Sequence, residues 1–200
     1  MRSLFRPALV ASAFALLSAA PASALMQIDI FETGSGVTAT YSGSIDVTGL
    51  EFTSTQDGSD LTSAVFPGLP FFLSIDAASF DGYNLAEDVT PWEPFGAFTS
   101  TEAFETSGDA FGFAPGEGLV GKQFLLPAGY VSGATLSGSM SFLGATLASM
   151  GITAGSYSYA LPADTIQLTA GASPVPLPAA APLLAAGLGG LALLSRRRRG

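Results

Sequence analysis

The only catalytic-type side chains present in quantity are carboxylates. The sequence contains 16 Asp and Glu residues but no His and no Cys, which excludes Ser-His-Asp and Cys-His catalysis and zinc sites of the usual ligand types. A glycosidase needs two carboxylates facing one cleft, ~5–9 Å apart. The acids here are scattered from Asp29 to Asp164 without a motif. We therefore nominate no catalytic residue and expect a protein that is not an enzyme.

Two short acidic segments could offer oxygen ligands to a calcium ion. They are residues 57–60, Asp-Gly-Ser-Asp, and residues 87–88, Glu-Asp. Neither has the spaced ligands of an EF-hand loop or a repeated nonapeptide. A charged turn is the simpler interpretation, so we predict no cofactor and keep Ca²⁺ only as a weak alternative.

The single Trp lies among prolines and acids, in the segment Pro91-Trp92-Glu93-Pro94. A Trp beside carboxylates in a loop can stack on a sugar ring, as in a carbohydrate-binding module. Tyr83 is another aromatic that could serve this purpose. The alternative is that Trp92 packs in the core or against a loop.

The charge of the chain is divided by segment. Between Asp29 and Asp164 the sequence has 16 acids and one basic residue, Lys122, a net charge of −15. Such a body repels the phosphates of nucleic acids and anionic lipids. We therefore predict no nucleic-acid partner. The other basic residues lie near the two ends of the chain.

The N-terminus has the features of a secretory signal peptide over residues 1–24. Arg2 and Arg6 precede a 13-residue apolar run at 8–20, which is shorter than the ~20 residues that span a membrane. Ala22 and Ala24 form the small-x-small pattern of a signal-peptidase site. We predict export through the Sec translocon and cleavage before Leu25.

The C-terminus, residues 175–200, combines three elements in a fixed order. The proline motif consists of Val175, Pro176, Leu177, Pro178 and Ala179. A predicted transmembrane helix follows at 180–194, and then the basic stop, Arg196, Arg197, Arg198 and Arg199. Basic clusters tend to stay in the cytoplasm, so the tail and the signal peptide predict the same topology across the inner membrane.

This tail resembles a PEP-CTERM sorting signal in its VPLPA form, with Leu177 where the namesake motif has Glu. The resemblance implies recognition by exosortase, cleavage near the proline motif and export together with exopolysaccharide. Residues 126–151 also look like the body of other members of that family. Two other interpretations are a plain single-pass anchor and a sortase signal, although the Thr-Gly of a sortase signal is missing.

Strand-type alternation dominates the body, residues 25–174. The longest run is 37–48, and the phase reverses after Gly49, which indicates a turn or bulge. Further runs are 134–142, 27–31, 71–76, 156–161 and 165–169. The residues predicted to share the apolar faces are Val37, Ala39, Tyr41, Ile45, Val47, Leu136, Met140, Phe142, Ile28, Ile30, Leu73, Ile75, Tyr157, Tyr159, Ile166 and Leu168.

Two stretches are less regular. Residues 80–110 predict long loops with one or two short strands, and residues 145–150 fit either a helical turn or a strand. Many short strands with turn signals predict an all-β fold. We expect an antiparallel, jelly-roll-like β-sandwich, flanked by an N-terminal signal helix and a C-terminal transmembrane helix.

The polar faces of these strands consist of Ser and Thr rather than Lys and Glu. Such a face can hydrogen-bond sugars, carry O-linked sugars or simply be solvated. The segments at 39–44 (Ala-Thr-Tyr-Ser-Gly-Ser) and 134–139 (Ala-Thr-Leu-Ser-Gly-Ser) are similar. They indicate either two related hairpins or a coincidence in a chain rich in small residues.

These features together favour an exported surface or matrix protein. It would be anchored briefly in the inner membrane and then be released to the cell surface or the medium, in association with exopolysaccharide. The alternatives are a carbohydrate-binding module, a carboxylate-based hydrolase and a permanently anchored membrane protein.

Overall fold

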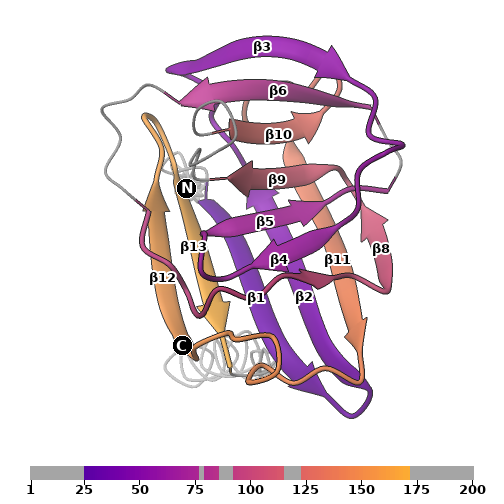
Figure 1. Ribbon diagram of the computed structural model, residues 1–200. Coiled ribbons are helices and arrows are strands. Elements are labelled where there is room, and N and C mark those ends of the chain that lie inside the picture. Colours follow the sequence, from indigo (N-terminus) through magenta and orange to yellow (C-terminus); the bar gives the residue numbers. More distant parts are fainter. Residues whose placement is uncertain (1–24, 77–78, 86–91, 115–122, 172–200) are drawn as a thin grey trace, which may run out of the picture.

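The computed structural model describes residues 25–76, 79–85, 92–114 and 123–171, which form strands joined by turns and loops (Figure 1). The strands are β1 (Leu25–Thr33), β2 (Gly36–Ser44), β3 (Leu50–Gln56), β4 (Ala64–Phe66), β5 (Phe71–Ser74), β6 (Phe80–Leu85), β7 (Thr101–Glu102), β8 (Glu105–Gly108), β9 (Phe111–Ala114), β10 (Gln123–Pro127), β11 (Thr135–Leu143), β12 (Gly155–Ala160) and β13 (Thr165–Ala170). The all-β prediction is confirmed for these residues.

The described strands form two packed sheets. The six-stranded sheet has the order β12-β13-β1-β2-β11-β8, and the seven-stranded sheet has the order β3-β6-β10-β9-β5-β4-β7. In Figure 1 the strands of the seven-stranded sheet run across those of the six-stranded sheet behind it. Two sheets packed in this way enclose a core between their inner faces. The predicted sandwich is thus confirmed at the level of two packed sheets.

One strand pair departs from the predicted antiparallel arrangement. β1 and β13 run parallel, with Ile28 beside Leu168, whereas the other paired strands of the described residues are antiparallel. Alternation shows which residues share a face of a strand but not which way its neighbour runs. The sequence pattern therefore could not reveal this exception.

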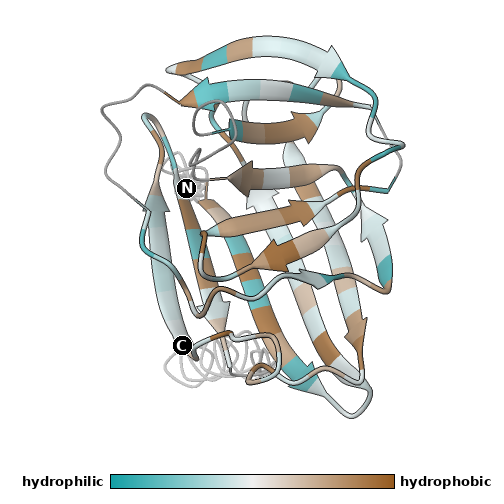
Figure 2. Ribbon diagram, in the orientation of Figure 1, coloured by the Kyte–Doolittle hydropathy of each residue, from teal (hydrophilic) through white to brown (hydrophobic). Residues whose placement is uncertain are grey.

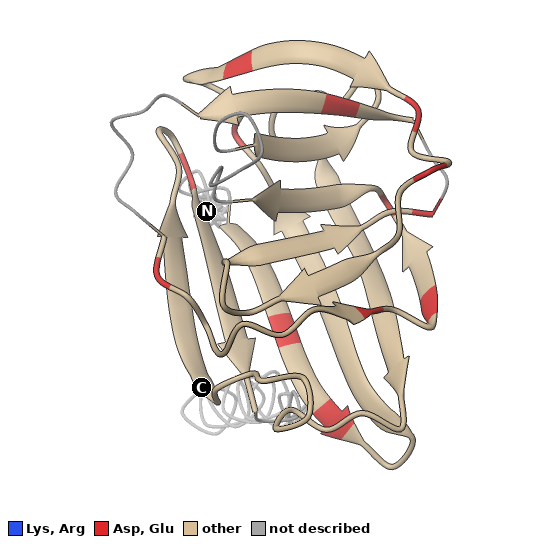
Figure 3. Ribbon diagram, viewed as in Figure 1, with Lys and Arg blue, Asp and Glu red and all other residues tan. Residues whose placement is uncertain are grey.

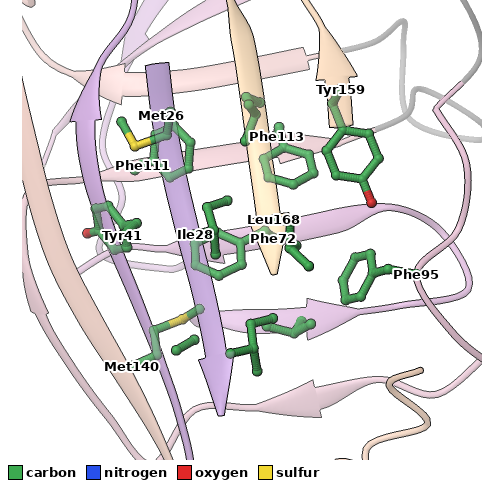
Figure 4. Close-up of a cluster of buried hydrophobic side chains, with 14 of the residues drawn as sticks. Met26, Ile28, Tyr41, Phe72, Phe95, Phe111, Phe113, Met140, Tyr159 and Leu168 are labelled. Atoms are coloured by element: carbon green, nitrogen blue, oxygen red, sulfur yellow. The ribbon is translucent and has the colours of Figure 1, made fainter. Parts of the chain in front are cut away.

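The core between the sheets is rich in aromatic rings (Figure 4). Tyr41 of the six-stranded sheet lies 5.2 Å from Phe111 and 5.9 Å from Phe72, measured between ring centroids. Both Phe residues belong to the seven-stranded sheet. Fully burying such a side chain contributes about 1.5–3 kcal/mol. These rings therefore hold the two sheets together.

Four of the predicted strands are confirmed, namely those at 27–31, 134–142, 156–161 and 165–169. Their apolar residues alternate with polar ones, as the brown and teal bands along β1 in Figure 2 illustrate. The buried residues in these four strands include Ile28, Ile30, Leu136, Met140, Phe142, Tyr159, Ile166 and Leu168. Tyr157 is half-buried.

The strand predicted at 37–48 ends early, at Ser44. In the following loop, side chains take the place of a neighbouring strand as hydrogen-bond partners. The backbone N of Ile45 donates to the Tyr130 hydroxyl over 2.9 Å, and that of Val47 donates to Ser132 Oγ over 3.1 Å. Ile45 is still buried, as predicted. The predicted turn at Gly49 is confirmed, because its φ is 83°.

The strand predicted at 71–76 corresponds to β5, which ends at Ser74. Leu73 and Ile75 are buried, as predicted, but outside the main core between the sheets. They pack in a second apolar cluster with Phe80 and Ala110, while Phe72 enters the main core. Residues 71–75 contain four large apolar side chains in five positions. A nearly continuous apolar run does not reveal which face is the inner one.

Residues 80–110 contain more strand than predicted, since β6, β7 and β8 all lie within this range. The stretch 145–150 is a turn of helical type. The backbone N of Met150 donates to the carbonyl of Thr146 over 3.0 Å, and the side chains of Thr146 and Ser149 each accept a hydrogen bond from the other's backbone N. This reciprocal capping satisfies the ends of the turn.

The two similar segments are neighbours in the fold. Residues 39–44 in β2 pair antiparallel with residues 135–140 in β11, and Ser42 lies directly opposite Ser137. These two serines occupy equivalent positions in the similar segments. The similarity therefore corresponds to two central strands of one sheet, related locally by a twofold axis, and not to two separate hairpins.

Candidate functional site

The outer surface of the six-stranded sheet carries mostly short, uncharged side chains, and we call it the hydroxyl face. Its polar residues are Ser156 and Ser158 of β12, Thr165, Gln167 and Thr169 of β13, Gln27 and Asp29 of β1, Thr38, Thr40, Ser42 and Ser44 of β2, Thr135, Ser137, Ser139 and Ser141 of β11, and Ser107 of β8. The apolar residues Leu25, Phe31 and Leu143 lie on the same face. These residues alternate along their strands with core residues such as Ile28 and Met140. They therefore point away from the core.

The strand register arranges the hydroxyl face in rows that cross the sheet. The first row is Ser156, Thr169, Asp29, Thr40, Ser139 and Ser107, one residue from each strand. The second row is Ser158, Gln167, Gln27, Ser42 and Ser137. Neighbouring strands lie ~4.8 Å apart, so the first row extends over about 24 Å.

Several polar groups of the hydroxyl face are open to solvent or a ligand. Asp29 is the one residue in the two rows that has a carboxylate. Its Oδ1 accepts a hydrogen bond from Gln27 Nε2 over 3.0 Å. Within the described part of the chain, the hydroxyl groups of Thr40, Ser42 and Ser137 have no protein partner. Each hydroxyl can donate one hydrogen bond and accept two.

The surroundings of this face are acidic. Among the residues that the structure describes, every charged side chain is an Asp or a Glu (Figure 3). Glu105 of β8 stands at the margin of the face, opposite Ser141. A surface of this kind repels polyanions.

Two carboxylates, Asp46 and Asp164, meet where the β2–β3 loop lies beside the β12–β13 turn. Asp164 accepts hydrogen bonds from the backbone N of Asp46, over 2.8 Å, and of Thr165, over 2.6 Å. Asp46 Oδ1 accepts from the backbone N of Thr48, over 2.9 Å, and from Ser132 Oγ, over 3.0 Å. The two carboxylates thus fasten loops to one another.

Their environments shift the two pKa values in opposite directions. Burial raises the pKa of Asp164, although hydrogen bonds from two backbone N–H groups limit the rise. Hydrogen bonds, above all from Thr48, hold the pKa of Asp46 below its ordinary value. Glycosidases use such a combination. Here oxygens of both carboxylates already accept hydrogen bonds that hold the loops, so the pair gives no positive support to a hydrolase.

The aromatic residues proposed for sugar stacking are buried. Trp92 is 7% exposed, its ring lies against Phe113 and Tyr159, and its Nε1–H donates to the Ala160 carbonyl over 3.4 Å. Tyr83 is 8% exposed. The core-packing interpretation of Trp92 is therefore the correct one, and neither ring presents a face to a sugar.

The acidic segment at 57–60 forms a turn. Asp57 Oδ1 accepts a hydrogen bond from the backbone N of Ser59 over 3.0 Å. Among the described residues, no group of three or more acids is arranged to hold a metal ion. The other calcium candidate, residues 87–88, lies outside the described residues.

The predicted processing sites lie almost entirely outside the described residues. This holds for Ala22 and Ala24, for the proline motif at 175–179 and its helix at 180–194, and for the basic stop at 196–199. Leu25, the predicted first residue after cleavage, is the first residue of β1 and is 46% exposed. The part of the chain that the structure describes contains no helix capable of crossing a membrane.

Comparisons of this chain with protein-family models, curated proteins and solved structures found no match. The candidate site is therefore supported by the geometry of this chain alone. Sequence reasoning identified the Ser and Thr residues but missed Gln27 and Gln167, which lie side by side in the second row. Their alternation with Ile28 and Leu168 was the signal that could have placed them.

Proposed function

We propose that this chain is an exported, non-enzymatic protein of the cell surface or extracellular matrix, associated with exopolysaccharide. The Sec translocon carries it across the inner membrane, and signal peptidase cleaves between Ala24 and Leu25. The helix at 180–194 then holds it in that membrane with the basic stop, residues 196–199, in the cytoplasm. Exosortase cleaves near the proline motif at 175–179 and releases the body.

The proposal extends to the fold of the whole chain. In it, a jelly-roll-like body is flanked by a signal helix and a transmembrane helix. The body has no Cys, so it folds outside the cytoplasm without depending on disulfide formation.

One observation supports the proposal: segments that resemble export and sorting signals enclose a body whose broad outer sheet face is built mostly of uncharged polar side chains. Such a face suits contact with a hydrated, uncharged matrix. The carboxylates Asp46 and Asp164, by contrast, hold loops in place. Sorting and surface display therefore explain more of the chain than catalysis does.

The test is the intact mass of the protein recovered from producing cells, for the wild type and for a Pro176→Ala/Pro178→Ala variant. We expect the extracellular wild-type protein to begin near Leu25 and end near the proline motif. The variant should stay in the membrane fraction with its tail uncleaved. A wild-type protein that keeps residues 196–199 and remains in membranes would instead establish a permanent anchor.

A further inference from the structure

We infer that the hydroxyl face binds an uncharged polysaccharide whose chain lies across the strands, along the row from Ser156 to Ser107. This inference rests on the proposed function, which places the body in a polysaccharide matrix. It adds the binding surface, the direction of the bound chain and the chemical class of the polymer.

The centre of the face offers pairs of hydroxyl groups at a regular spacing. Thr40 lies opposite Ser139 and Ser42 lies opposite Ser137, in the two central strands β2 and β11. The Ser139 hydroxyl also shares a hydrogen bond of 3.0 Å with the Ser107 hydroxyl. Sugar hydroxyls, like those of Ser and Thr, both donate and accept hydrogen bonds, so either polymer orientation finds partners. The amide of Gln167 adds donors and an acceptor in the second row.

The charge of the molecule selects the class of polymer. The described residues include acids but no Lys or Arg, and Asp29 lies within the first row itself. An anionic polysaccharide would meet repulsion from Asp29 and from Glu105 at the margin. A neutral polymer avoids that repulsion and gains the same hydrogen bonds.

The length of the rows favours a polymer over a single sugar. Each hydrogen bond exchanged with water contributes little on its own. Phe31 offers a half-exposed ring beside the rows, whereas the rings of Trp92 and Tyr83 are buried. Along a row of about 24 Å, one polysaccharide chain can make many weak contacts at the same time. Binding is therefore expected to strengthen steeply with the length of the sugar chain.

The geometry favours noncovalent binding over attachment of O-linked sugars. Thr40 and Ser139 lie within β2 and β11, which are paired with neighbours on both edges, and both residues are only half-exposed. A glycosyltransferase must reach its acceptor residue closely, and the interior of a paired sheet restricts that access. A ligand lying flat on the sheet meets no such restriction.

The test compares a face variant with a matched control. Thr40→Val/Ser139→Ala removes two adjacent hydroxyls while keeping side-chain shape and strand preference. The control, Thr62→Val/Ser54→Ala, makes the same two changes outside the six-stranded sheet, at exposed positions. Affinity electrophoresis through gels containing dextran, hydroxyethylcellulose or galactomannan measures binding, with alginate as the anionic comparison. Thermal unfolding midpoints establish that both variants are folded.

We expect at least one neutral gel to retard the wild-type protein and the control equally, alginate to have no effect, and the face variant to bind about tenfold more weakly. Equal retardation of all three proteins, retardation by alginate alone, no retardation by any neutral gel, or peptide fragmentation spectra that place O-linked sugars on residues of the face would overturn the inference. The assay can use protein extracted from membranes in detergent. Failure of tail cleavage would therefore refute the sorting proposal without affecting this result.

Discussion

The ring of Tyr41 in β2 lies so closely across Gly138 in β11 that a Cβ atom at position 138 would collide with the ring and its hydroxyl group. The Tyr41 hydroxyl reaches past this glycine to the carbonyl of Asp109 and to Ser74 Oγ, which is 3.1 Å away. Ser74 belongs to β5 of the seven-stranded sheet. Gly138 therefore makes room for a side chain that links the two sheets.

Gly138→Ala should destabilise the fold by about 1–3 kcal/mol, the cost of overpacking a tight core. The matched control is Gly34→Ala, because an added Cβ at Gly34 meets nothing within 4 Å. Urea unfolding measures both free energies. A Gly138→Ala variant as stable as the control would show that Tyr41 does not occupy this position.

A double-mutant cycle assigns the cost to Tyr41. In a Tyr41→Leu background the ring is gone, so Gly138→Ala should cost less than it does in the wild type. Some cost should persist, since the added Cβ would still lie 2.6 Å from the Ser107 carbonyl oxygen. Additive effects of the two substitutions would rule out the proposed contact.

The sequence predicted the elements of the fold better than their assembly. Alternation identified β1, β2, β11, β12 and β13 because each places apolar and polar residues on opposite faces. It could not show that β1 and β13 run parallel, because both directions give the same pattern. The rows of the hydroxyl face depend on strand order and register, so they emerged only with the structure.

The position of Trp92 was open in the sequence for a related reason. Its neighbours Pro91, Glu93 and Pro94 are typical of an exposed loop, yet the ring is buried against Phe113. A local segment with polar neighbours can insert apolar side chains into a core that other strands build. Local composition therefore predicted the loop but not that the rings of Trp92 and Phe95 point into the core.

Trp92→Ala should cost about 3–5 kcal/mol, as expected for emptying a core site of this size. Since this is the only Trp of the chain, its fluorescence reports directly on the site. We expect blue-shifted emission in the native protein, a shift to the red on unfolding, and no change on adding dextran. A red emission maximum in the native state, or quenching by the polymer, would place the ring at the surface.

Alkaline pH should destabilise the protein through its buried tyrosines. Burial raises the pKa of Tyr159 and of Tyr41 above the ordinary value of 10.0. Their contribution to stability is thus fully present below pH 10.0 and is lost as the pH rises through the raised native values. Tyr159→Phe should unfold at a higher pH than the wild type. Ultraviolet absorbance follows the ionisation of tyrosine and circular dichroism follows unfolding, so the two together measure the alkaline midpoint of each protein. An unchanged alkaline midpoint would contradict this.

The acid side of the stability profile should separate Asp46 from Asp164. The pKa of Asp46 is lowered by folding, so its contribution is present above the ordinary value of 3.8 and is lost as the pH falls below it. The pKa of Asp164 is raised, so its contribution is present below 3.8 and is lost as the pH rises through the native value. The two carboxylates therefore respond to acid in opposite directions.

Urea unfolding of Asp46→Asn and Asp164→Asn from neutral pH down to about pH 3 measures both contributions. Asp46→Asn keeps a side-chain acceptor for Thr48 and should flatten the loss of stability below pH 3.8. In Asp164→Asn, an NH2 group replaces one of the two acceptor oxygens. One backbone N–H, of Asp46 or of Thr165, then loses its acceptor, which should cost about 1–3 kcal/mol at neutral pH. The deficit of this variant relative to the wild type should grow as the pH falls towards 3.8, because the wild type gains stability there by protonating Asp164. Parallel profiles for the two variants would mean that the carboxylates do not hold the loops as the structure describes.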